Sequence, residues 1–376
     1  MAIFLILIII AGAFSYLYFS NLVGDSAETE PVYVGVAFQG DTVEEAKLLI
    51  DRVKDYTNVF VLGHTPVSRD EASTNEVCDY AVSRGLKIIV NFGYYDPYAT
   101  SDQLFRRWSW QHTWVEAAKL KYGSYFLGVY YDDEPGGIQI DWEWDEFFQN
   151  YTRYFSQPVD NPLHKTYAKI IESNASGIYP ENYDLEAEFF TETVFNETRG
   201  HIPLGEAEVT TFTSDYALYW YDYLGGYDVL LAQIGWNHTF EQDIGLLRGA
   251  ARLQNRTWGT IITWKYDTPP YLNTGPEVYR EMVDSYRAGA KYILFFNYPE
   301  LDGNDYGAMQ HEHFEALEQF WKDYVRPQRA ADLSEAEAAL VLPRNYGWGM
   351  RHPETRFGEC GDLMTNRSRY GTYRVS

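Results

Sequence analysis

Between residues 32 and 328, short apolar runs typical of buried β-strands alternate with longer amphipathic stretches typical of helices. Such alternation is the pattern of a parallel sheet whose strands are joined by helices. We expect eight strands, at Val32–Phe38, Asn58–Gly63, Leu86–Gly93, Phe126–Asp132, Glu208–Ser214, Asp228–Gly235, Trp258–Trp264 and Lys291–Asn297. Eight strand–helix units in a stretch of this length predict an α/β fold of the (β/α)8 TIM-barrel type.

The helix-like stretches carry recognisable start and stop signals. Glu44 and Glu45 fall in the first turn of one such stretch, and Gly85 follows the next as a cap. A doubly wound open sheet is the alternative fold, but the Gln-Gly-Asp-Thr turn after the first strand is no dinucleotide-binding fingerprint. Residues 140–206 are interpreted as a helical excursion with an irregular insertion. The other expected helices are Thr42–Tyr56, Asp70–Arg84, Gln103–Lys121, Phe240–Gln254, Glu277–Ala288 and His311–Tyr324.

A stretch without charged residues, 1–23, precedes the barrel and is strongly apolar over Ala2–Ile10. Twenty-odd helical residues span roughly 30 Å, the hydrocarbon thickness of a bilayer. The stretch is therefore a single transmembrane helix or a cleaved export signal. The lack of a basic region before the apolar run, and the poor cleavage site at Ala11–Ala13, favour a retained anchor.

The expected organisation has four parts. Residues 1–23 form the membrane segment, 24–31 a polar linker, 32–328 the barrel domain, and 329–376 a C-terminal extension that could begin a truncated second module. Within the extension, Leu333–Ala339 is expected to be helical and Ala339–Pro343 strand-like. A glycine- and aromatic-rich loop follows, which either folds over the barrel mouth or packs as a surface strap.

Composition narrows the class of partner and the compartment. A net charge of −24 and an isoelectric point near 4.6 argue against nucleic-acid binding, because phosphates would be repelled. The expected location is the cell membrane, single-pass with the barrel outside, or secretion if the first segment is cleaved. Six sequons fit a glycoprotein in that location, at Asn150, Asn174, Asn196, Asn237, Asn255 and Asn366.

Cysteine and histidine patterns give no metal signature. Cys78 and Cys360 lack ligand spacing, and a disulfide between them is left open. Cys78 is expected to be a buried helix residue. The eight histidines include no HExxH-like pair, so we expect neither a metal nor a cofactor, and the sequence indicates no oligomeric state.

The fourth expected strand ends in three consecutive carboxylates, Asp132, Asp133 and Glu134, and then in a Pro-Gly-Gly stop. Because side chains alternate along a strand, Tyr130, Asp132 and Glu134 should share one face, with Tyr131 and Asp133 on the other. Carboxylates are rare at the end of a buried strand unless something uses or pairs them. In a (β/α)8 barrel that end of a strand carries the chemistry, so a site is favoured over an idle acidic turn.

Aromatic and amide side chains are expected at the same end of the barrel. Aromatic residues make up 17% of the chain, and tyrosine and tryptophan offer flat faces for stacking on sugar rings. For each residue the alternative is barrel packing or loop support, and His64 is expected to be satisfied locally. Stacking candidates are Tyr94, Tyr95, Trp236, Trp264, Tyr266 and Tyr298; other substrate-binding candidates are Asn91, Asp96, Tyr130, Gln233 and Asn297.

The run Gly128–Glu134 resembles the strand-four signature of the TIM-barrel glycoside hydrolases. Its spacing is most similar to the Gly-x-Asp-x-Asp-x-Glu pattern of the chitinase-like group: Asp132 and Glu134 match the last two acidic positions, and Tyr130 stands at the first. The closing Asp-Glu-Pro is also similar to strand ends of other barrel glycosidases, where the glutamate is the general acid/base. The resemblance covers a few residues and the expected strand order, so it implies a class without assigning a family.

The resemblance implies a glycosidase that cleaves O-glycosidic bonds of a neutral poly- or oligosaccharide with Glu134 as general acid/base. Asp132 could raise the pKa of Glu134 through its like charge. The second catalytic carboxylate is expected at Asp267, with Asp96, Asp215 and Glu300 as alternatives. The rival interpretation is a non-catalytic cell-surface barrel that binds or organises polysaccharide. A lyase or esterase is less favoured, because no Gly-x-Ser-x-Gly elbow is present.

Overall fold

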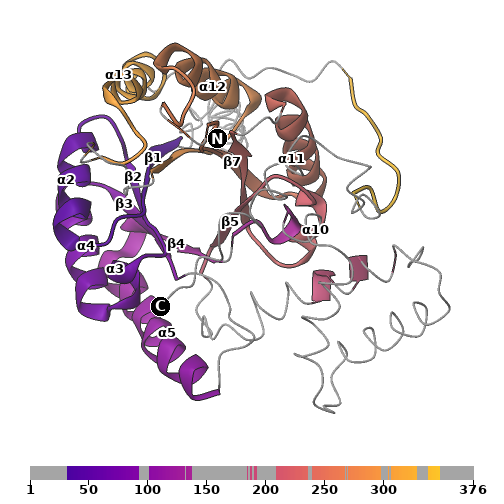
Figure 1. The fold of residues 1–376 in the computed structure, drawn as a ribbon. Helices are drawn as coiled ribbons and strands as arrows, with labels where there is room; N and C mark the ends of the chain where they lie inside the picture. The colour runs from indigo at the N-terminus through magenta and orange to yellow at the C-terminus, as the bar shows by residue number, and fades with distance from the viewer. Residues whose placement is uncertain are drawn as a thin grey trace, which may run out of the picture.

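In the computed structural model, eight parallel strands close into one barrel surrounded by helices (Figure 1). The strands pair in sequence order, and the last strand pairs with the first. The strands are β1 (Tyr33–Phe38), β2 (Val59–Leu62), β3 (Lys87–Asn91), β4 (Phe126–Tyr130), β5 (Thr211–Asp215), β6 (Val229–Ile234), β7 (Thr257–Ile262) and β8 (Tyr292–Asn297). The residues that the structure describes are 32–92, 101–131, 133–137, 184, 187–188, 190–192, 209–235, 239–266, 268, 270–297, 304, 306–327 and 338–347.

The predicted (β/α)8 barrel and the position of each of its eight strands are confirmed. The largest difference in the strand bounds is at β5, which begins at Thr211, three residues later than expected. Strands β3, β4 and β7 each end two residues earlier than expected, at Asn91, Tyr130 and Ile262. Most other ends differ by a single residue, because the apolar runs that predicted the strands are the same residues that the barrel buries.

Helices cover the outside of the barrel and connect most of the strands. Thr42 caps the first of them in a capping box with Glu45, as the acidic first turn indicated. Cys78 is buried in α4, as expected. The helices are α2 (Val43–Val53), α3 (Pro66–Arg69), α4 (Glu71–Ser83), α5 (Ser101–Tyr122), α10 (Tyr219–Leu224), α11 (Phe240–Gln254), α12 (Gly275–Ala288) and α13 (His311–Phe320), with a 3-10 turn η1 (Gly123–Tyr125) and a π-helical turn η3 (Trp321–Val325).

The helix expected at His311–Tyr324 is present: α13 runs to Phe320 and continues directly as the π-helical turn η3. A second expectation about the later part of the chain is wrong. The strand expected at Ala339–Pro343 does not form, and Leu340 and Val341 are exposed there. A closed barrel has no free strand edge, so this apolar run has no backbone partner in the sheet.

The core has two parts, separated by the wall of the barrel. Inward-facing residues fill the barrel interior, where Tyr292 stacks on Tyr33 at 4.9 Å and meets the edge of Phe212 at 5.1 Å. The alternate residues of each strand face outward and pack against the helices in a larger cluster. This alternation decides which residues at the strand ends face the interior.

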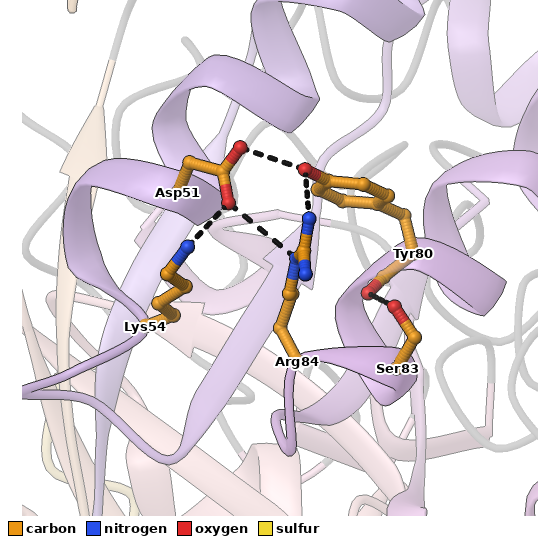
Figure 2. Close-up of polar contacts among 5 residues, drawn as sticks. All are labelled: Asp51, Lys54, Tyr80, Ser83 and Arg84. Carbon is orange, nitrogen blue, oxygen red and sulfur yellow. Dashed lines mark hydrogen bonds and ion pairs between the residues drawn. The ribbon is translucent and has the colours of Figure 1, made fainter.

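Helices α2 and α4 are joined on the surface by a polar cluster around Tyr80 (Figure 2). The Tyr80 hydroxyl donates to Oδ2 of Asp51 at 2.7 Å, and Arg84 donates to the same hydroxyl at 2.8 Å. The other carboxylate oxygen of Asp51 lies 2.8 Å from Nζ of Lys54. Because these side chains are largely solvated, the cluster orients the two helices more than it stabilises them.

Some expectations fall on residues outside the described part of the chain. They concern the membrane segment 1–23, the linker 24–31, nearly all of 140–206 and the end of the C-terminal extension. Among the residues that the structure describes, no helix is both long enough and apolar enough to span a bilayer.

Barrel closure predicts the effect of one glycine substitution. A Cβ on Gly35 would lie 1.9 Å from the carbonyl oxygen of Val59 in the neighbouring strand. We expect Gly35→Ala to destabilise the protein by about 1–3 kcal/mol or more in urea denaturation, since the two strands cannot separate without opening the barrel. Gly245, inside α11, is the control: a Cβ there meets nothing within 4 Å, and alanine should stabilise the helix by about 0.5–1 kcal/mol. Equal stability of the two variants would contradict this account.

Candidate functional site

The carboxyl ends of β4, β5 and β6 are joined by three buried polar side chains that face the barrel interior, Tyr130, Ser214 and Gln233, and by the partly buried Asp133. The hydroxyls of Tyr130 and Ser214 both donate toward Oδ1 of Asp133, at 2.9 and 2.8 Å. Nε2 of Gln233 donates to the Ser214 hydroxyl at 3.0 Å, and the backbone N–H of Ser214 donates to the Tyr130 hydroxyl at 2.9 Å. Three strands are thus tied together where the apolar interior of the barrel ends.

Asp133 does not lie where strand alternation predicted. It was expected on the face opposite to Tyr130, yet the two side chains are hydrogen-bonded. The reason is that β4 ends at Tyr130, and Glu134 takes the left-handed conformation, with φ of 55°. Tyr131 does face outward, as expected, and is buried against the helices.

The turn after β4 is fixed to the end of β5 by the carboxylate of Asp215. Its two oxygens accept four backbone N–H groups, from Gly136, Gly137, Tyr216 and Ala217, at 2.5, 2.8, 2.7 and 3.1 Å. The backbone N–H of Glu134, just before this turn, also donates a hydrogen bond to the carbonyl of Ser214 at 2.9 Å. We call this set of bonds around Asp215 the β4–β5 clasp.

Both glycines of the clasp are required by close approach. A Cβ on Gly137 would lie 2.2 Å from the ring of Tyr216, and one on Gly136 would lie 2.7 Å from the carbonyl oxygen of Ala217. Leu218, just beyond, also has a left-handed backbone, with φ of 51°. The Pro-Gly-Gly stop seen in the sequence is therefore the part of the chain that lets the Asp215 carboxylate reach two successive amides.

Asp215, one of the alternatives for the second catalytic carboxylate, is fully buried on the helix side of the barrel wall. Burial raises the pKa of Asp215 to about 7, and the four backbone donors act in the opposite direction. Because both of its oxygens are already occupied by the clasp, Asp215 is placed to hold the turn and not to contact a substrate.

The structure brings some of the substrate-binding candidates together and separates others. Asn91 and Gln233 both lie at the ends of strands on inward-facing positions and are buried. Asn297 instead shares the outward face of β8, and its side-chain oxygen accepts the N–H of Met309 at 3.3 Å. Asn297 therefore supports a loop, which is the alternative that the sequence left open.

The two described aromatic candidates lie on the loop after β7. The ring of Trp264 lies 6.3 Å from those of Tyr271 and Phe296, and Tyr266 is exposed. His64 accepts a hydrogen bond from Arg69 at 3.2 Å, in line with its expected local role. The remaining candidates lie outside the described residues: Asp132, Asp267, Tyr94, Tyr95, Asp96, Trp236 and Tyr298.

Several site residues were not singled out from the sequence. Asp133, Ser214 and the clasp role of Asp215 depend on which strands are neighbours and on the turn after β4. The amide of Gln39, which directly follows β1, packs so closely over Gly63 that a Cβ there would lie 2.4 Å from it.

Metal ligands are not grouped in the described part of the chain. No set of three histidine, cysteine, aspartate or glutamate side chains there could hold a metal ion. The chemistry that the described site offers is that of carboxylates, hydroxyls and amides.

No family model matches the chain, and no curated protein matches it. Among solved structures, β-glucosidase 1317 is similar, with 12% identity, 78% of this chain and 91% of that chain covered, and a TM-score of 0.42. An endo-β-1,4-mannanase from Thermotoga petrophila is 9% identical over 80% of this chain and 78% of its own, with a TM-score of 0.43. Gas2p of Saccharomyces cerevisiae in complex with laminaripentaose is 9% identical over 83% and 67%, also at 0.43. Likenesses at TM-scores below 0.5 carry no argument about activity.

The clasp predicts a local effect of one substitution. In Asp215→Asn, an amide NH2 replaces a carboxylate oxygen and opposes backbone N–H donors, so we expect a loss of about 1–3 kcal/mol in stability. Hydrogen exchange at the amides of Gly136 and Gly137 should rise more than exchange elsewhere in the barrel. Asp41→Asn, at an exposed position, is the matched control and should change neither quantity. Unchanged protection of the two glycine amides in Asp215→Asn would rule out the clasp.

Proposed function

We propose that this chain is a glycoside hydrolase in which Glu134 is the general acid/base. One observation carries the proposal: Glu134 lies just beyond the carboxyl end of β4, in a left-handed backbone, next to the hydrogen-bonded cluster of buried Tyr130 and Ser214 with partly buried Asp133. That end of a barrel strand is the position from which (β/α)8 enzymes act on their substrates.

The backbone of Glu134 supports a functional role for its side chain. A non-glycine residue in the left-handed region costs on the order of 1 kcal/mol, and such strain persists only where surrounding contacts impose it. Here the contacts are the bond from Glu134 N–H to the Ser214 carbonyl and the clasp on the next residues. Glycine would relieve the strain, and glutamate occupies the position instead.

The side chains around the same barrel end favour an uncharged, hydroxyl-rich substrate. Gln39, Asn91 and Gln233 provide amide groups that can both donate to and accept from sugar hydroxyls. Trp264 and the exposed Tyr266 on the β7 loop offer aromatic faces. A neutral poly- or oligosaccharide matches these groups.

The proposed reaction uses two carboxyl groups. Glu134 in its acid form protonates the glycosidic oxygen as the bond from that oxygen to the anomeric carbon breaks. A second carboxylate either attacks the anomeric carbon or activates a water molecule, depending on its distance from Glu134. We propose Asp267 for that role and Asp132 as the group that raises the pKa of Glu134 by like charge.

Removal of the proposed acid should abolish turnover without unfolding the protein. In digestions of a glycan library, we expect Glu134→Gln to lower kcat/KM by about 10²–10⁴-fold on any glycan that wild type cleaves, because the proton donor is lost while the shape is kept. Glu71→Gln, at an exposed helix position, is the control and should cleave like wild type. Equal cleavage by Glu134→Gln would refute the assignment. Binding without cleavage by wild type would support the rival, a polysaccharide-binding barrel.

We also propose that the chain is anchored in a membrane through residues 1–23, with the barrel outside the cell. The support is the uncharged apolar stretch together with the sequons away from the end of α11, at Asn150, Asn174, Asn196, Asn237 and Asn366. The full chain should stay with membranes after an alkaline carbonate wash, and the double variant Ile6→Asp/Ile9→Asp should be released, because two carboxylates within the bilayer are costly. Release of the wild-type chain by the same wash would refute anchoring.

A further inference from the structure

Four large apolar side chains are exposed at the amino-terminal end of the barrel, opposite to the proposed active site. Leu120 lies near the end of α5 and is 88% exposed, and Leu253 lies near the end of α11 and is 78% exposed. Leu224 ends α10, and Tyr125 lies in the turn before β4; both are also exposed. In a parallel barrel, helix ends and strand starts lie on the same side, so these four side chains share one rim.

Basic side chains lie on the same rim. Last-turn residues include Lys119 and Lys121 of α5, Arg252 of α11 and Arg287 of α12, all exposed. Acidic groups are also present there: Asp79 lies 2.6 Å from Lys121 and Asp228 lies 2.9 Å from Arg256, while Asp55 and Asp284 are exposed. In a chain with a net charge of −24, this rim carries exposed cations beside exposed leucines.

The chain also enters the barrel at this rim. Strand β1 begins at Tyr33, directly after the linker 24–31 that follows the apolar stretch. Eight residues span at most about 28 Å when fully extended, so the rim cannot move far from wherever residue 23 is held.

We propose that this rim, formed by Leu120, Tyr125, Leu224 and Leu253 with the neighbouring lysines and arginines, rests on an anionic lipid surface. This inference rests on the proposed membrane anchoring and is independent of the glycosidase chemistry. Apolar side chains enter the headgroup boundary while cations contact lipid phosphates, as in interfacial binding segments. The strand carboxyl ends then face away from the membrane, toward substrate.

Lipid is a better match for the rim than a protein partner. The four apolar side chains come from separate helix ends around the rim and are interleaved with cations. A protein-binding patch would need a contiguous apolar centre with charges at its margin. A bilayer surface contacts scattered apolar tips and cations at the same time.

Spin labels can locate the rim relative to the membrane in the full-length chain. In a Cys360→Ser background, with Cys78 buried, a nitroxide is attached at Leu253→Cys, Leu120→Cys or Tyr266→Cys. Tyr266 is exposed on the loop after β7, at the opposite end of the barrel, and is the matched control. Each protein is reconstituted into phosphatidylglycerol-containing vesicles, and collision rates are measured with oxygen, which enters lipid, and with a water-soluble nickel chelate.

We expect the nickel chelate collision rate to fall severalfold at positions 120 and 253 relative to position 266. Replacing phosphatidylglycerol by phosphatidylcholine, or adding about 1 M salt, should reduce this difference, because the cations are then screened or unmatched. Water-like collisions at all three positions in protein that floats with vesicles would overturn the rim proposal and leave anchoring intact. Lipid-like collisions at position 266 would also overturn it. Protein that does not float would overturn anchoring and the rim proposal together, while the Glu134→Gln result would be unaffected.

Discussion

Closure of eight parallel strands into one ring is the constraint on which the other features depend. Every strand has two hydrogen-bonded neighbours, so no backbone edge is left open. Closure demands close approach at particular points: a Cβ on Gly35 or Gly259 would lie within 2.4 Å of a carbonyl oxygen of the next strand. It also brings eight carboxyl ends to one side, so residues far apart in sequence, such as Tyr130 and Gln233, both contact Ser214.

At the junction of β4 and β5, barrel closure brings a side chain of β5 within hydrogen-bonding distance of the segment that follows β4. Asp215 occupies an outward position on β5, and its carboxylate binds the N–H groups of Gly136 and Gly137 in the short helical segment 135–137 that follows β4. This arrangement places two left-handed non-glycine residues, Glu134 and Leu218, on either side of one buried carboxylate. Four backbone N–H bonds to the Asp215 carboxyl group offset part of the free-energy cost of that backbone. A turn held in this way presents Glu134 in one defined backbone conformation.

The strands are predictable from the sequence because burial on both faces makes each one a continuous apolar run. Helix α2 is predictable from its amphipathic pattern and from Glu44 and Glu45 in its first turn. Two predictions from the sequence were wrong because they depend on contacts between segments far apart in the chain. The face of Asp133 depended on β4 ending at Tyr130, and alternation no longer applies once a strand has ended. Ala339–Pro343 has strand composition, but the closed barrel offers it no edge. The sequence therefore located the candidate site at the end of β4 and could not give the roles of Asp133, Ser214 and Asp215, which require the register between strands.

The basic residues and the exposed leucines at the amino-terminal rim of the barrel have different physical explanations. Cations in the last turn of a helix compensate its dipole, so Arg252 and Arg287 would be favourable at the amino-terminal rim even in a protein that never meets a membrane. Leucine gains nothing from a helix dipole, and an exposed leucine keeps its apolar surface in water. The positions of Leu120 and Leu253, more than those of the basic residues, therefore distinguish a lipid-facing rim from an ordinary set of helix ends. If the rim is lipid-facing, the polar cluster around Ser214 lies at the end of the barrel directed away from the membrane, and a bulky polysaccharide could approach Glu134 from the solvent.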